Sequence, residues 1–377
     1  KHPLLPEIAA EAPSGWYAFC MFLDMKQVLI GLFALPLIVT VFLPAGAEEI
    51  PQEYSRLELN RIREIEVPEG FSVDYYAKAP GARSITPGPR GTYFVGTRDD
   101  RVYAVIDEDA DGAADRVRTI LTGLNMPNGV AYKDGDLYVA EVGRIIVVRN
   151  AARKLAKNPG DLAYEVITEA YPDRAAHGWK FIAFSPDGFL HVPVGAPCNV
   201  CDPEEEIFAS ITRIDVDNPE IEVLARGVRN TVGFDWHPET GELWFTDNGR
   251  DWLGDNEPPD ELNRLSVPGE HFGFPYIHGE SIEDPEFGDS AGDSSRFTGP
   301  VRELGPHVAA LGMRFYTGDM FPTRYRGQIF IAEHGSWNRS EKIGYRVTLV
   351  GIDGPEAGDY SVFASGWLDR RTGRAWG

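Results

Sequence analysis

The sequence predicts an all-β protein, specifically a six-bladed β-propeller. Three observations favour this fold: a repeated pair of strands around a glycine turn, a spacing typical of propeller blades, and the near absence of helical periodicity. The 377 residues include 40 glycines and 28 prolines, which indicates many turns and short strands. With 43% hydrophobic and 25% charged residues, the composition is that of an ordinary globular protein.

The repeat is an apolar strand, a tight turn with glycine, and a second strand rich in aromatic and β-branched residues. The turn glycines are Gly91, Gly135, Gly188, Gly241 and Gly327. They lie 44, 53, 53 and 86 residues apart, and the last gap contains a polar loop insertion at about 252–306. Periods of ~40–50 residues with several short strands are typical of propeller blades.

A propeller must close, because open terminal blades leave unpaired strand edges. The fifth repeat is followed by GWLDRRTGRAWG, 366–377, without another pair of strands. We therefore expect a C-terminal blade to be missing from this chain, with FSVDYYA, from Phe71, as the strand that closes the ring with it. The alternative is a five-bladed propeller. AARKLAKN, from Ala151, is expected to form one or two helical turns.

Residues 25–47 have the features of a secretory signal peptide. Lys26 supplies the basic region, an apolar stretch of 16 residues covers 28–43, and Ala45-Gly46-Ala47 offers a cleavage site before Glu48. That stretch is short for a bilayer span, which needs ~20 residues, although an uncleaved anchor is the alternative. We expect a periplasmic or secreted protein with no stable membrane span after cleavage.

The signal peptide separates the two other segments of the chain. Residues 1–24 are interpreted as a misassigned leader, and 48–377 as the propeller domain. The formal net charge of −22 argues against a nucleic-acid partner, because phosphate binding requires clustered Lys and Arg. A neutral or cationic small molecule remains compatible with this charge.

Two of the three cysteines, Cys198 and Cys201, form a CNVC motif, and the third, Cys20, lies in the leader. The residue after the motif is Asp202 rather than histidine, which argues against covalent haem attachment. No second CxxC exists to complete a zinc site. In an oxidising compartment the expected state is a local disulfide that pins a loop.

Aligning the repeats on their turns brings polar residues to equivalent strand starts. Because the first strand of each propeller blade lines the central channel, equivalent starts converge at one mouth. The residues at these starts are Asn128, His177, Arg229 and His307. Strand ends expected around the same opening are Glu141, Asp247, Glu333 and His334.

Several long motifs together resemble the glucose/sorbosone dehydrogenase family, most closely its L-sorbosone dehydrogenase-like branch. They are HGWKFIAFSPDG from His177, GAPCNVC from Gly195, RGVRNTVGFDWHPETGELWFTDNGRDWLGD from Arg226, PPDELNRL from Pro258, AALGMRFYTGDMF from Ala309 and AEHGSWNRS from Ala332. The resemblance runs from about residue 68 to the end. It implies a six-bladed propeller that oxidises a sugar or related aldehyde with pyrroloquinoline quinone (PQQ), usually assisted by Ca²⁺, and passes electrons to an unidentified acceptor.

The resemblance assigns chemical roles to two residues. His177 matches the family's catalytic base, and an imidazole with an ordinary pKa near ~6.5 suits proton abstraction. Arg229, followed by Asn230, matches the pair beside the quinone, where a permanent positive charge stabilises the reduced ring. The structural alternatives are a capping or core histidine and an inter-blade salt bridge. Ala176 stands where soluble glucose dehydrogenases have an acidic residue, so any orienting carboxylate must come from another strand.

The resemblance also implies further cofactor-binding residues, because PQQ carries three carboxylates. Basic residues in the corresponding stretch are Arg339, Lys342 and Arg346, while Arg98 and Arg314 are weaker candidates. The segment 254–263 resembles the family's metal-binding segment, since Ca²⁺ prefers oxygen ligands. The matching residues are Asp255, Asn256, Asp260 and Glu261, and a solvated acidic loop is the alternative.

DEDADGAAD, 107–115, also has the spacing of a calcium loop. It lacks the glutamate at position twelve, so a turn between blades is the favoured interpretation.

Two other functions remain open at the sequence level. Calcium-dependent propeller lactonases are hydrolases that need metal-activated water but no cationic cradle for a tricarboxylate. The predicted basic cluster therefore favours the dehydrogenase. A binding propeller without chemistry is the second alternative, because fold does not determine function.

Overall fold

The computed structural model describes residues 49–157 and 160–376. These residues belong to one compact unit. The predicted leader and signal peptide, 1–24 and 25–47, lie outside the described residues. No helix in the described part of the chain is long and apolar enough to cross a membrane.

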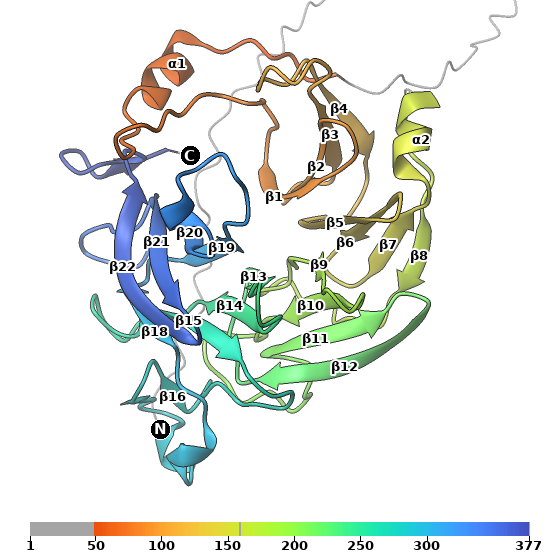
Figure 1. The fold of residues 1–377 in the computed structure, drawn as a ribbon. Helices are drawn as coiled ribbons and strands as arrows, with labels where there is room; N and C mark the ends of the chain where they lie inside the picture. Colours follow the sequence, from red (N-terminus) through yellow and green to blue (C-terminus); the bar gives the residue numbers. More distant parts are fainter. Residues whose placement is uncertain (1–48, 158–159, 377) are drawn as a thin grey trace, which may run out of the picture. The chain divides into compact units, whose positions relative to one another are not determined.

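Five antiparallel four-stranded sheets form the blades, arranged around a shared centre (Figure 1). Blade 1 contains β1 (Ala82–Pro87), β2 (Thr92–Thr97), β3 (Val102–Ile106) and β4 (Arg116–Leu121). Blade 2 contains β5 (Gly129–Lys133), β6 (Asp136–Ala140), β7 (Ile145–Val148) and β8 (Glu165–Thr168). Blade 3 contains β9 (Ala183–Phe184), β10 (Leu190–Val194), β11 (Ser210–Asp215) and β12 (Asn218–Arg226).

In every blade the strands are given in order from the centre outward, and the remaining two blades are arranged in the same way. Blade 4 contains β13 (Gly233–Trp236), β14 (Leu243–Asp247), β15 (Pro259–Leu265) and β18 (Arg302–Pro306). Blade 5 contains β19 (Ala310–Phe315), β20 (Ile329–Glu333), β21 (Arg346–Asp353) and β22 (Glu356–Ala364). The all-β prediction and the blade repeat are confirmed.

Short elements precede the first blade, follow the last one or lie between two strands of the same blade. Helix α1 (Arg56–Ile62) begins with a capping box in which Ser55 and Glu58 satisfy each other's backbone N–H groups. Helix α2 (Ala151–Lys157) confirms the one or two helical turns expected there. The other elements are β16 (Ile277–His278), β17 (Ile282–Glu283), β23 (Leu368–Asp369), β24 (Arg374–Ala375) and the 3₁₀ turns Gly288–Ser290, Ser294–Arg296 and Thr323–Tyr325.

The predicted insertion at 252–306 is too wide, because both of its flanks contain strands of blade 4. Two parts of this range lie outside the four-stranded sheet: residues 252–258, before β15, and the longer segment 266–301, between β15 and β18. Strand β15 escaped sequence analysis because its buried side chains include Asp260, Glu261 and Asn263. A strand whose buried positions are polar shows no apolar alternation.

Apolar side chains fill the space between consecutive blades. Each of four clusters joins two neighbours, as Val102 of blade 1 joins Val139 of blade 2, and Trp244 of blade 4 joins Ile331 of blade 5. All four of these side chains have no accessible surface. This packing fixes the angle between sheets and therefore brings the inner strands to one centre.

A sixth blade is not confirmed, since the described residues contain five four-stranded sheets. The segment expected to close the ring, FSVDYYA, does not form a strand. Instead, the Phe71 ring packs edge-on against Phe321 and Phe363 of blade 5, with centroids 4.8 and 5.0 Å away. Tyr76 packs against Tyr93 of blade 1 at 5.5 Å. Aromatic packing on two blades, rather than strand pairing, holds this segment.

Val350→Ala is expected to lower the free energy of unfolding by about 2 kcal/mol, because it removes two buried methyl groups and leaves a cavity. Val350 is fully buried between blades 4 and 5. Urea denaturation measures this change. Val267→Ala is the matched control, since Val267 is 61% exposed and its truncation should change the free energy little. Equal effects of the two changes would show that inter-blade packing does not limit stability.

Candidate active site

A cavity of about 1030 Å³ lies where the inner ends of the five blades meet. The four predicted strand-start residues all line it: Asn128, His177, Arg229 and His307. His334, predicted at a strand end, lines it as well. The convergence predicted from the repeats is therefore confirmed for these five side chains.

His177 lies in the loop before β9, with a backbone φ of +46° that is uncommon for a residue other than glycine. Its Nδ1 is 2.8 Å from the carbonyl oxygen of Ala196. A carbonyl oxygen only accepts, so Nδ1 carries the hydrogen and Nε2 keeps its lone pair in the neutral ring. A backbone carbonyl, rather than a carboxylate, performs this orienting role. Gly195 packs against the Cβ and the backbone oxygen of His177, where a Cβ on residue 195 would approach the His177 Cβ to 2.5 Å.

The protonation of His177 is set by its surroundings. Burial, and next the positive charge of Arg229, lowers the pKa of His177 to about 4, while the bond to Ala196 opposes this shift. Both causes penalise the imidazolium, because it would be a second cation in a poorly solvated site. His177 is therefore neutral at pH 7, as a base must be before it accepts a proton.

Arg229 is only 4% exposed, and protein acceptors surround its guanidinium. Nε donates to the Asn199 carbonyl (2.8 Å), Nη1 to the Asn248 carbonyl (3.1 Å), and Nη2 to Asn199 Oδ1 (2.9 Å). Nη2 also lies 3.3 Å from the Asp251 carboxylate. Four of the five guanidinium N–H groups thus donate hydrogen bonds to acceptors within the protein. Arg229 acts on the cavity mainly as a fixed positive charge.

Asn230 also lines the cavity, and a hydrogen bond to Asp247 holds its backbone in place. The Asp247 carboxylate accepts from the backbone N–H groups of Arg229 (2.7 Å) and Asn230 (2.6 Å). Burial raises the pKa of Asp247, although these two hydrogen bonds oppose the shift. Asp247 is therefore a support for the loop and is not among the cavity-lining residues.

Two other predicted strand-end acids pair inside their own blades. Glu141 forms an ion pair with Arg144 and accepts from the backbone N–H of Asn125. Glu333 forms an ion pair with Arg346 at 2.7 Å and a hydrogen bond with Tyr360. Neither acid lines the cavity.

The predicted cofactor-binding residues Arg339, Lys342 and Arg346 do not line the cavity. Arg346 points within blade 5 toward Glu333, and the ammonium of Lys342 lies over the Tyr345 ring. The cations that reach the cavity are on other elements: Arg83, Arg98, Arg229 and Arg314. The lining contains two carboxylates, Asp251 and Asp260. The cavity therefore has an excess of positive charge within a strongly acidic chain.

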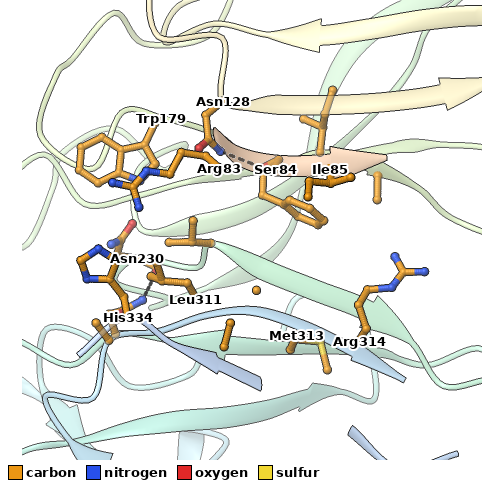
Figure 2. Close-up of a pocket in the computed structure, with 18 of the residues that line it drawn as sticks. Arg83, Ser84, Ile85, Asn128, Trp179, Asn230, Leu311, Met313, Arg314 and His334 are labelled. Atoms are coloured by element: carbon orange, nitrogen blue, oxygen red, sulfur yellow. Dashed lines mark hydrogen bonds between the residues drawn. The ribbon is translucent and has the colours of Figure 1, made fainter. Parts of the chain in front are cut away.

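Sequence analysis missed Arg83 and gave Arg98 only as a weaker candidate. The Arg98 guanidinium lies 4.0 Å from the Trp179 ring centroid. Burial, and next the charge of Arg98, lowers the pKa of Arg83, while Asp99 opposes the shift. Within the described residues, neither guanidinium has a hydrogen bond or an ion pair of 4 Å or less. Figure 2 shows Arg83, Trp179, Asn230 and His334 at one end of the cavity, with Met313 and Arg314 at the other.

The predicted metal ligands do not form one cluster. Asp260 is buried and accepts from the Gly249 N–H (2.9 Å), and Glu261 accepts from the Gly279 N–H (2.7 Å). Asp255 instead accepts from the Ser340 N–H near the surface. Among the described residues, the one group of three acidic or metal-binding side chains with ligand atoms within 4.8 Å is in the blade 1 turn: Asp107, Asp109 and Asp115. Asn256 is exposed.

The Cys198–Cys201 disulfide predicted from the sequence is present, with Cα atoms 6.1 Å apart. It encloses Asn199, whose contacts with Arg229 were missed because the motif was read only as a loop anchor. The same network includes Asn338, which donates to Asp251 at 2.7 Å. Asn338 follows Trp337, a cavity-lining side chain that is 67% exposed.

Comparisons with known proteins give a family and a shared fold. The family model for glucose/sorbosone dehydrogenase matches residues 143–336. An uncharacterized protein of Borreliella burgdorferi is 35% identical over 343 residues, which cover 88% of this chain and 87% of that protein.

Solved structures with lower identity share the fold alone. The PQQ domain of Coprinopsis cinerea pyranose dehydrogenase, in its holo form, gives a TM-score of 0.66 at 18% identity, over 81% of this chain and 87% of that one. A calcium structure of a Trichoderma reesei family AA12 enzyme gives 0.66 at 17%, over 80% and 87%. The apo soluble aldose sugar dehydrogenase of Escherichia coli gives 0.57 at 14%, over 82% and 91%.

His177 is expected to titrate near pH 4 and to be protonated on Nδ1 at pH 7, since burial and Arg229 disfavour its charged form. NMR of the ring nitrogens over a pH series measures both properties, with His177→Ala as the control that identifies the signals. A midpoint at 6.5 or above, or a ring protonated on Nε2, would contradict the site geometry.

Proposed function

Because the chain belongs to the glucose/sorbosone dehydrogenase family, we propose that it is an oxidoreductase that oxidises a sugar or sugar-derived aldehyde with PQQ. The observation that carries this proposal is the cavity itself. It holds a neutral imidazole and a fixed guanidinium beside it. Within residues 49–157 and 160–376, Nε2 of this imidazole has no hydrogen-bond partner, and two further guanidiniums have no ion-pair partner. A base and an anion-binding surface therefore occupy one space.

The cavity residues fit PQQ on two counts. A planar tricarboxylate needs cations, and Arg83 and Arg98 supply two that no described carboxylate neutralises by direct contact. It also needs space beside a sugar, and about 1030 Å³ is at the upper end of the range for small-molecule sites. Trp179 and Trp337 offer aromatic surface in the same lining. When bound, the quinone supplies the hydride acceptor.

His177 is the proposed base. Its Nε2 accepts the hydroxyl proton of the sugar or the carbonyl hydrate while the hydrogen on the same carbon departs as hydride. Ala196 holds the ring through Nδ1, so the basic nitrogen keeps one direction. An anion in the cavity favours the imidazolium, so carboxylates bound near Arg83 and Arg98 raise the pKa of His177 and make it a stronger base.

Arg229 stabilises negative charge without moving. Its guanidinium is held at four contacts and stays charged at any working pH. A preorganised charge in a water-poor site stabilises an anion more than a mobile surface charge does. We propose that the negative charge that develops during reduction lies close to this guanidinium, with Asn230 beside it.

The hydrolase alternative is less well supported. A lactonase of this type needs a metal to activate water, and the cationic lining of this cavity has no role in that chemistry. Calcium binding at Asp255, Asn256, Asp260 and Glu261 stays a prediction. If the protein were a binding propeller without chemistry, the lone pair on Nε2 of His177 would have no catalytic role.

The location and partners are also proposals. The Cys198–Cys201 disulfide supports an oxidising compartment, consistent with a periplasmic or secreted protein. The sugar or aldehyde is the small-molecule partner, and the electron acceptor that reoxidises the quinone is unidentified.

Reconstitution with PQQ and Ca²⁺, followed by dye reduction on a panel of sugars, tests this function. Wild-type protein is expected to reduce the dye, and His177→Ala to lower kcat roughly a hundredfold to ten-thousandfold, because it removes the general base. Near-wild-type turnover in His177→Ala would reject the assignment of the base. Lactone hydrolysis without dye reduction would favour the hydrolase.

Arg83→Gln and Arg98→Gln are each expected to weaken PQQ binding by about tenfold, because each removes one charge-assisted hydrogen bond to a carboxylate. Equilibrium titration of protein fluorescence with PQQ measures the Kd. Arg339→Gln and Lys342→Gln are matched controls whose side chains do not line the cavity. If the controls bound PQQ more weakly and the two cavity variants bound it unchanged, the sequence-based assignment of Arg339 and Lys342 to PQQ binding would be right.

A further inference from the structure

The segment Ala196–Cys201 contacts both side chains proposed for chemistry. The Ala196 carbonyl accepts from His177 Nδ1, and its N–H donates to the Arg229 carbonyl, each at 2.8 Å. Three residues later, Asn199 accepts from the Arg229 guanidinium at both its backbone oxygen (2.8 Å) and Oδ1 (2.9 Å). One short segment therefore orients the base and the cation together.

Asn199 is fixed from its other side by Asp251. The Asp251 N–H donates to Asn199 Oδ1 (2.9 Å), and Asn199 Nδ2 donates to the Asp251 carbonyl (3.2 Å). The Asp251 carboxylate in turn lies 3.3 Å from Arg229 Nη2. Oδ1 of Asn199 must accept from Arg229 Nη2 and from the Asp251 N–H, while Nδ2 must donate to the Asp251 carbonyl. A single orientation of the side-chain amide therefore satisfies all three partners.

The disulfide closes the loop immediately around Asn199. Cys198 and Val200 pack against a small core that contains Ala196 and Phe274, which anchors the loop at its start. The entropy that a disulfide removes from the unfolded chain grows with loop length, so a bridge over two residues contributes little to global stability. Its main consequence is local, because it restricts the backbone that presents the two oxygens of Asn199.

We propose that the Cys198–Cys201 bridge and Asn199 form a positioning device for Arg229 and His177, so that full activity requires the oxidised bridge. This inference rests on the proposed function. Reduction adds two electrons and two protons, breaks the S–S bond, leaves two thiols and converts a dithiol reagent into its own disulfide. Asn199 then loses its constraint, and the guanidinium shifts away from the imidazole. The chain therefore gains full activity only where thiols are oxidised.

The first test compares oxidised and dithiol-treated holoenzyme. Reduction is expected to lower kcat about tenfold, since small displacements of catalytic groups have large effects on rate, while the Kd for PQQ changes less than twofold. The double variant Cys198→Ser, Cys201→Ser should match the reduced enzyme and not respond to the dithiol. An unchanged kcat after complete reduction, verified by thiol counting, would overturn the proposal.

Variants of Asn199 separate positioning from folding. Asn199→Ala removes Oδ1 and should lower kcat about tenfold with the melting temperature preserved. Asn199→Asp keeps an oxygen toward Arg229 but loses the Nδ2 donor to the Asp251 carbonyl, so it should restore part of the rate. Asn218→Ala, at the exposed first residue of β12, is the matched control and should have no effect. Loss of rate in Asn199→Ala that tracks a fall in melting temperature, without rescue by Asn199→Asp, would indicate a structural role only.

A measurement on the apoprotein keeps this inference separate from the proposed function. Burial is the larger cause of the low pKa of His177 and the charge of Arg229 is the second, so displacement of the guanidinium should raise the NMR-measured pKa of His177 above about 4, while burial still holds it below its ordinary value. This rise is expected on reduction and in Asn199→Ala. If it occurs but the oxidised holoenzyme oxidises no sugar, the proposed function fails and the positioning device stands. If the pKa stays constant, the positioning device is wrong.

Discussion

The buried charge of Arg229 is the constraint on which the rest of the site depends. Removing a guanidinium from water is costly unless protein acceptors replace the lost hydration, and an unpaired buried donor costs about 1–3 kcal/mol. Loops that follow β10 and β14 supply these acceptors, through Asn199, Asn248 and Asp251. The loops are thereby held in one arrangement, and burial together with this fixed charge keeps the neighbouring His177 neutral.

Blade packing provides the geometry in which this constraint operates. Apolar clusters between consecutive sheets set the position of each inner strand, so the residues at the strand starts meet at one centre. The turn glycines showed this repeat in the sequence, and aligning them correctly brought His177, Arg229 and His307 together. These residues were predictable because they follow directly from the period of the chain.

The cations around them were not predictable from the period, because the position of a strand within its blade decides which residues reach the cavity. Arg346 begins β21, the third strand of blade 5, so its guanidinium meets Glu333 of the adjacent strand. Arg83 lies on β1, the innermost strand of blade 1, and reaches the cavity (Figure 2). Strand β15 was hidden for a related reason, since buried Asp260 and Glu261 resemble a polar loop.

We propose that this protein oxidises a sugar by hydride transfer to PQQ while His177 takes the proton. A decisive experiment is the single-turnover reduction of PQQ in the reconstituted protein, followed by its absorbance, with a sugar deuterated at the carbon that is oxidised. The quinone is expected to be reduced in one phase, and deuterium is expected to slow this phase several-fold, since the C–H bond breaks in it. An absorbance that stays unchanged with every sugar, or a reduction rate insensitive to deuterium when chemistry is rate-limiting, would rule out this mechanism.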